Sequence, residues 1–232
     1  MAFLAALQQA PGNKFSSWAK SMSVAAVFGA IGSVVGALGV FGTATALAHP
    51  ENLAQASPSM LLVTLVGLFF YGVGLVWFST ALMMFTVRSA QFVRDRGAVL
   101  KWKAYWGFWG WFVPILSLFV PYLVLRDVVL ASESKETAEH RRSLLWFWIW
   151  WTVLSGLINV AMQFIQATDP ANAFTGWSMF AGVMAFQLVP FMMGRALFTK
   201  IDADLRAVLA AKPEEPEISA DKEQTGKDDA AK

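Results

Sequence analysis

Five long stretches of the chain contain no Asp, Glu, Lys or Arg, and short charged connections separate them. The helical segments that we expect within them cover residues 22–46, 60–87, 104–125, 144–166 and 174–194. A helix that spans the hydrocarbon core of a bilayer needs about 20 apolar residues. Each segment meets that length, so the pattern predicts an all-α polytopic membrane helix bundle.

The placement of Lys and Arg decides how many of these segments cross. Cytoplasmic loops carry an excess of both residues. If residues 104–125 enter and leave on one face, all eighteen Lys and Arg lie on the side of the two termini. If all five segments cross, the same residues divide eleven to seven. We therefore predict four spanning helices plus one Pro-broken re-entrant or interfacial helix, with both termini cytoplasmic. Five spans are the alternative.

The third segment has the composition of a broken helix that is anchored at an interface. Pro114 and Pro121 each lack a backbone donor and clash with the preceding helical turn. Trp102, Trp106 and Trp109 share one helical face, and a second group of tryptophans begins the fourth segment. Indole rings prefer the membrane–water interface, so this pattern favours a segment held at the cytoplasmic side.

Short motifs in the third segment also point to a family. The residues concerned are Gly110, Trp111, Phe112, Pro114, Pro121, Tyr122, Arg126 and Asp127. Together with the following WFWIWW helix they resemble the bacterial, mostly actinobacterial, membrane proteins that carry domain of unknown function 4328. The resemblance is strong over residues 102–160 and implies a plasma membrane protein without an assigned activity. We expect Arg126 and Asp127 to form a local ion pair that ends the segment.

Small residues line one face of the first segment at alternating spacings of four and three. They are Ala25, Gly29, Gly32, Gly36, Gly39 and Thr43. Small side chains let two helices approach closely in lipid. The face predicts either a packing seam within the chain, against Gly67 and Gly74, or an interface with a second copy or another protein.

A polar stripe follows one face of the fourth segment, and its members are Thr152, Ser155, Asn159, Gln163 and Gln166. Polar side chains of this kind hydrogen-bond neighbouring helices in membranes. The stripe therefore predicts interhelical contacts or, alternatively, the lining of a site for a small polar ligand.

A basic loop joins the second and third segments and contains Arg88, Arg94, Arg96, Lys101 and Lys103. It is a topological determinant, and it also favours contact with anionic lipid, at about 1 kcal/mol per basic side chain. We expect no nucleic-acid partner beside a bilayer.

Candidate catalytic chemistry is sparse. The chain has no Cys, which excludes thiolate metal sites and cysteine nucleophiles. His49 and His140 are expected in loops on opposite sides of the membrane, where they cannot share a metal or haem. The predicted spans contain no Asp, Glu, Lys or Arg, which lowers the expectation of an ion pathway. We expect no cofactor, no metal and no enzymatic activity.

The two ends of the chain differ from its centre. Residues 1–20 are expected to form a cytoplasmic segment, with an uncleaved first helix preferred to a signal peptide, and residues 21–195 the membrane domain. Residues 196–212 predict an amphipathic cytoplasmic helix with Leu197, Ile201, Leu205 and Val208 on its apolar face. Residues 213–232 are expected to be a disordered charged tail.

These observations favour a non-enzymatic accessory or scaffold component of a membrane assembly. One alternative is a small transporter or channel that uses the polar stripe. A second is a lipid- or quinone-binding module built on the tryptophans.

Overall fold

The computed structural model describes residues 14–48, 58–132, 137–166 and 170–210. The helices are α2 (Lys14–Ala48), α3 (Pro58–Asp95), α4 (Trp106–Trp109), α5 (Pro114–Ser117), α6 (Val120–Ala131), α7 (Thr137–Ile165) and α8 (Pro170–Ala210). No strand occurs in these ranges. His49 and residues 213–232 lie outside them, as does most of the predicted N-terminal segment, and α2 begins at Lys14.

Four helices, α2, α3, α7 and α8, are long and apolar enough to cross a membrane. The shortest qualifying stretch has 27 residues, which is roughly 40 Å of helix, against a hydrocarbon core of about 30 Å. The prediction of an all-α bundle with four spanning helices is confirmed.

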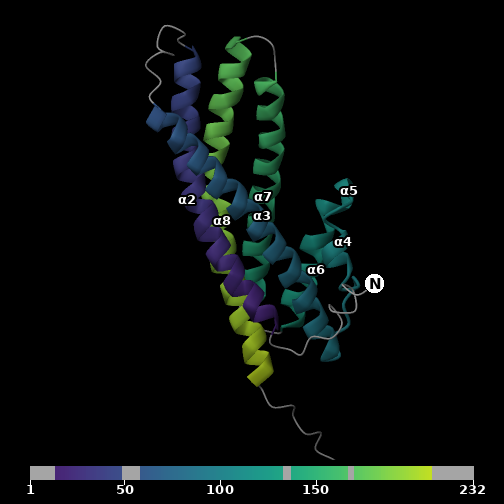
Figure 1. Ribbon diagram of the computed structural model, residues 1–232. Helices are drawn as coiled ribbons and strands as arrows, with labels where there is room; N and C mark the ends of the chain where they lie inside the picture. Colours follow the sequence, from purple (N-terminus) through teal and green to yellow (C-terminus); the bar gives the residue numbers. More distant parts are fainter. Residues whose placement is uncertain (1–13, 49–57, 133–136, 167–169, 211–232) are drawn as a thin grey trace, which may run out of the picture.

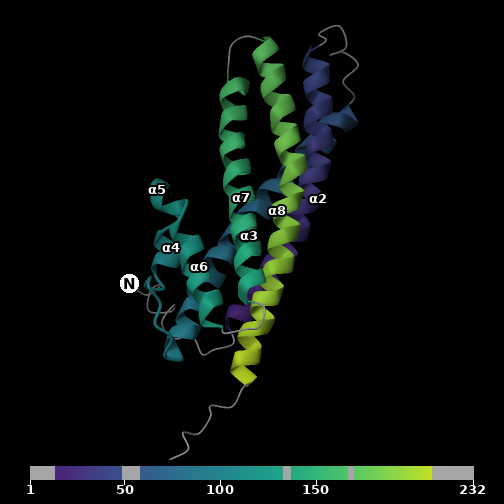
Figure 2. The ribbon, with the colours of Figure 1, turned by 180° about the vertical axis from the view of Figure 1, so that it is seen from behind.

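The third segment does not form a fifth spanning helix. It divides into α4, α5 and α6, the longest of which has 12 residues. Proline disfavours helical backbone in the residue before it, and Val113, before Pro114, is extended with φ −97° and ψ 113°. The chain rises through α4 to α5 and returns through α6, so the segment starts and finishes toward the same end of the bundle (Figures 1 and 2). The alternative of five spans is wrong for this reason.

Packing between α2 and α3 is close enough to bring two backbones together. A Cβ atom on Gly67 would collide with the backbone at Gly36, and one on Gly74 would collide with Gly29. The Oγ1 atoms of Thr43 and Thr64 lie 3.0 Å apart and extend this seam as a hydrogen bond. The glycine face is thus a packing seam within the chain. Of the two alternatives for this face, an interface with a second copy or another protein does not fit, because α3 and α8 cover it.

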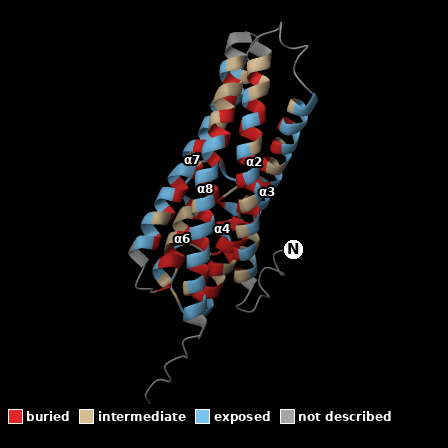
Figure 3. Ribbon diagram, turned by 90° about the vertical axis from the view of Figure 1, so that its left-hand side faces the viewer, coloured by how far each residue is buried: buried red, intermediate tan, exposed pale blue. Residues whose placement is uncertain are grey.

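Aromatic rings fill the space where α3, α7 and α8 meet. The ring of Phe78 lies 5.4 Å from that of Trp151 and 5.4 Å from that of Phe191. The ring of Phe147 lies 5.3 Å from that of Phe198. Many of the buried residues gather in the half of the bundle that holds α4 and α6 (Figure 3).

Residues 196–212 are not a separate helix. They continue α8 without a break up to Ala210, and Leu197, Ile201 and Leu205 are buried as their spacing predicts. The beginnings of α2 and α7 and the ends of α3 and α8 lie toward one end of the bundle (Figure 1). This basic end therefore collects the described Lys and Arg residues.

Candidate functional site

Polar contacts at the basic end join α8 to helices that are distant in sequence. Asp202 of α8 is only 2% exposed. It pairs with Arg206 one turn later, and its Oδ2 accepts a hydrogen bond of 3.4 Å from Ser16 of α2. Asp202 is not one of the residues predicted on the apolar face of this helix, yet it is buried, because Ser16 of α2 lies against it. The Asp–Arg spacing of four residues was the signal for this pair.

His140 lies within α7 rather than in a loop, which corrects our expectation. It is 2% exposed, and its Nδ1 lies 3.1 Å from Oδ2 of Asp204 on α8. Beside it, Lys200 pairs with Glu139 at 3.3 Å, and both of these side chains are largely exposed. An exposed pair of this kind adds little stability. These contacts tie the start of α7 to the last turns of α8.

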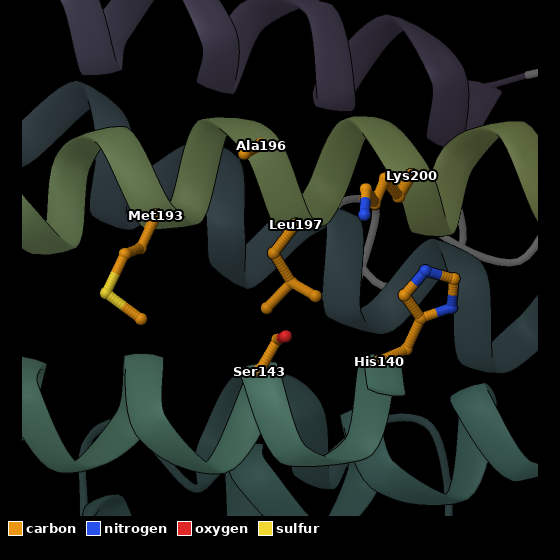
Figure 4. A pocket seen from close by; sticks show the side chains of 6 residues that line it. All are labelled: His140, Ser143, Met193, Ala196, Leu197 and Lys200. Carbon is orange, nitrogen blue, oxygen red and sulfur yellow. The ribbon is translucent and has the colours of Figure 1, made fainter. Parts of the chain in front are cut away.

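A small cavity lies next to His140 and Lys200, between α7 and α8 (Figure 4). His140 and Ser143 face it from α7, and Met193, Leu197 and Lys200 face it from α8. Its volume is about 160 Å³, below the roughly 300–1,000 Å³ of small-molecule sites. No group of three or more His, Asp and Glu able to hold a metal occurs in the described ranges. The residues that line this cavity pack α7 against α8.

The tryptophan-rich motifs hold the broken segment against α7. The indole Nε1 of Trp148 donates a hydrogen bond of 2.6 Å to the carbonyl of Leu118. The rings of Trp111 and Tyr122 lie 5.5 Å and 6.5 Å from that of Trp148. At Gly110, a Cβ atom would meet the side chain of Val120. These motif residues position α4, α5 and α6 on one another and on α7.

The remaining motif residues are Phe112, Pro114, Arg126 and Asp127, and no contact with α7 is described for them. Phe112 is 60% exposed, and nothing is described of the Pro114 side chain. Arg126 and Asp127 form the expected ion pair, with Arg126 Nη2 3.2 Å from Asp127 Oδ1. The pair does not end the segment, since α6 continues to Ala131.

The residues of the polar stripe either form hydrogen bonds within α7 or have exposed side chains, and Asn159 does both. Ser155 Oγ donates to the carbonyl of Trp151, and Asn159 Nδ2 donates to the carbonyl of Ser155, so both bonds stay within α7. Asn159, Gln163 and Gln166 are exposed, whereas Thr152 and Ser155 are half-buried. The outer part of the stripe therefore neither packs on another helix of the described chain nor lines an internal site.

The basic loop begins where α3 ends. Gly97 adopts a positive φ of 88°, which glycine tolerates without steric cost, and it turns the chain out of the helix. Arg88 and Arg94 lie within α3 rather than in the loop predicted to contain them, because the helix continues to Asp95. Arg88 is half-buried, whereas Arg94, Arg96, Lys101 and Lys103 are exposed. The guanidinium of Arg96 stacks on the ring of Phe92 at 4.9 Å.

Comparison with known proteins identifies the family. A family model described as a domain of unknown function (DUF4328) matches residues 44–202, which include α3 to α7 and most of α8. No curated protein and no solved structure matches the chain. Because the match spans more than half of the 232 residues, the chain belongs to the family defined by this domain.

Proposed function

We propose that this protein is a non-enzymatic component of a membrane assembly, and that it holds a partner protein against the outer part of α7. The observation that carries this proposal is the exposed stripe of Asn159 and Gln163 on a helix long and apolar enough to span, which Gln166 continues just past the end of the helix. Amide side chains are costly to leave in hydrocarbon without hydrogen-bond partners. A partner helix with polar side chains would supply those hydrogen bonds, at about 0.6 kcal/mol each.

The position of α7 at the edge of the bundle supports this role. It packs on α8 and, near its start, on α6, while α2 lies on the other side of α8 (Figures 1 and 2). Large apolar side chains flank the stripe and are exposed as well, among them Leu157, Val160 and Phe164. Apolar and amide side chains together match the interfaces that join helices in membranes.

Three of the described cations are engaged in ion pairs within the chain. Arg206, Arg126 and Lys200 each pair with a neighbouring carboxylate. Such pairs stabilise the structure, and each of these cations is already paired with a carboxylate. A transport route along the stripe would need a second chain to enclose it, so the transporter hypothesis is less well supported.

We further propose that the basic end faces the cytoplasm of a bacterial cell, since Lys and Arg concentrate on that side of plasma membranes. The absence of Cys makes this testable with single cysteines at Val99 and Thr175, both exposed and near opposite ends of the bundle. An impermeant maleimide applied to intact cells should label Thr175→Cys alone. Labelling of Val99→Cys alone would reverse the orientation.

Site-specific photo-crosslinking in cells tests the assembly. A photoreactive residue at Gln163 should give one crosslinked product of defined mass, and the same residue at Leu38, exposed on α2, should not. The product should disappear when Asn159→Leu is added to the chain that carries the crosslinker. Equal products from both positions, or a chain that is strictly monomeric, would refute the proposal.

A further inference from the structure

One face of α7 has the residue spacing of a helix that packs against another helix, and most of this face is exposed. Its members recur at intervals of four, three, four and three residues, and they are Thr152, Gly156, Asn159, Gln163 and Gln166, the last just past the end of the helix. We call this set the α7 pairing face. Alternating intervals of three and four place residues along the side of a helix that meets a neighbour in coiled-coil packing.

Gly156 provides a place on this face where another helix can approach closely. It is exposed, and no described atom outside its own stretch of helix lies within 4 Å of the position that a Cβ atom would take. On α2, by contrast, a Cβ atom on Gly32 would collide with the backbone of Tyr71 in α3. Both helices have the alternating spacing and a glycine, but only α2 has its neighbouring helix within the described chain.

The same side of α7 is already a packing surface nearer the basic end. Trp148 precedes Thr152 by about one turn, is only 6% exposed, and donates from Nε1 to the carbonyl of Leu118 in the broken segment. The broken segment, which contains α4, α5 and α6, lies beside the lower part of α7 and does not extend along its upper part (Figures 1 and 2). The α7 pairing face therefore continues an established packing surface and leaves roughly 20 Å of helix open.

The chemistry of this face is complementary to itself. An amide has two N–H donors and a carbonyl acceptor, and Asn159 uses one donor for the carbonyl of Ser155. Asn159 of one chain can therefore both donate to and accept from Asn159 of another. No Asp, Glu, Lys or Arg occurs from Ser143 to Thr168, so two such faces meet without like charges.

The membrane adds a condition on depth that a second copy meets. Two copies inserted in the same orientation hold Asn159 at one common depth and Gln163 at another. About a twofold axis, each amide then lies opposite its own counterpart. Any other protein would have to supply hydrogen-bonding side chains of its own at both depths.

We propose that two copies of this protein pair through the α7 pairing face, with Gly156 at a close approach of the two helices and the amides of Asn159 and Gln163 hydrogen-bonded across a twofold axis. This inference rests on the proposed function and deepens it, because it identifies the partner protein as a second copy of the same chain.

Single cysteines test the geometry, because the chain has no Cys of its own. The axis brings Gly156 of one copy near Gly156 of the other, whereas the exposed Leu157 points about 100° away around the helix. Mild oxidation of native membranes should join Gly156→Cys chains into a species of twice 25.5 kDa. Leu157→Cys should give roughly fivefold less, since a disulfide requires Cα atoms within about 7 Å. Equal yields from the two positions would overturn the proposal.

Energy transfer between labelled copies measures the contribution of the amides. Chains labelled at Val99→Cys, in the loop after α3, are diluted in lipid vesicles to obtain an association constant. Asn159→Leu should lower this constant roughly eightfold, the factor for two amide hydrogen bonds between membrane helices. Leu157→Ala, on the same helix but off the pairing face, should leave it unchanged. An unchanged constant in Asn159→Leu would contradict the proposed pairing.

The mass of the product crosslinked from Gln163 separates this inference from the proposed function. A mass of twice the chain supports both. A different mass, with no disulfide from Gly156→Cys, would mean that α7 holds another protein, which overturns the pairing of two copies and leaves the proposed function intact. A chain that gives no crosslinked product and stays monomeric would refute both.

Discussion

The α2–α3 seam and the outer part of α7 are both faces of spanning helices, but the first is covered by a neighbouring helix and the second is exposed. At the seam, glycines allow backbone contact, and Thr43 meets Thr64 across it. On α7, the side chains of Asn159 and Gln163 are exposed, and Asn159 Nδ2 donates to the carbonyl of Ser155 in its own helix. In lipid, helix association depends on close packing and hydrogen bonds rather than on the hydrophobic effect. The seam has both close packing and a hydrogen bond within one chain. The stripe has exposed amide groups that can form hydrogen bonds with a second chain.

The largest effect is expected at the seam. Gly74→Leu should destabilise the protein by about 3 kcal/mol or more, because the new side chain meets the backbone of Gly29, which cannot move aside. Thermal unfolding in detergent measures the loss. Gly72 of the same helix has nothing within 4 Å of its would-be Cβ, so Gly72→Leu should shift the free energy of unfolding by less than about 1 kcal/mol. Equal losses in both variants would show that the seam is not the critical contact.

A smaller effect is expected from the hydrogen bond across the seam. Thr64→Val keeps the side-chain shape but removes the bond to Thr43, and should cost about 0.6 to 1.7 kcal/mol. Thr80→Val is the matched control on α3, because Thr80 Oγ1 donates only to the carbonyl of Val76 in its own helix. If both valine variants unfold at the same temperature, the contact between Thr43 and Thr64 contributes nothing measurable.

Gln187 provides a buried counterpart to the stripe. It is 1% exposed, and both polar atoms of its amide lack a hydrogen-bond partner among the described residues. Gln187→Leu should leave stability unchanged or raise it by up to about 1 kcal/mol, because an unsatisfied amide is replaced by an apolar group. A clear loss of thermal stability would mean that Gln187 has a partner, such as a bound water or ligand.

The smallest effect on stability is expected at the stripe. The double variant Asn159→Leu, Gln163→Leu should change the free energy of unfolding of the isolated chain by less than about 0.5 kcal/mol, as is usual for exposed positions. The same variant should lose the crosslinked assembly in cells. Strong destabilisation of the isolated chain would show that the stripe makes stabilising contacts within the chain, as the seam does.

Much of the architecture could be predicted from local pattern. The charge-free stretches predicted five apolar helical segments, and the placement of Lys and Arg predicted that four of them span. Pro114 and Pro121 predicted the break in the third segment. The spacing of Gly29 and Gly36 predicted a packing face, because residues three and four apart share one side of a helix. The candidate sites were harder to predict from the sequence. The pairing of His140 with Asp204 and the burial of Asp202 against Ser16 depend on helices brought together over long sequence separations.

The sequence by itself therefore determined which residues are helical, which share a face and which helices are apolar enough for a bilayer. Periodicity, proline placement and the absence of charge are local properties, so they can be read without knowing the neighbours. Only the tertiary structure decided what each face meets. The glycine face meets α3, the outer stripe of α7 meets none of the described helices, and His140 meets Asp204 of α8. A helical pattern specifies the direction of a side chain relative to its own axis, while its environment depends on how the helices are arranged around one another.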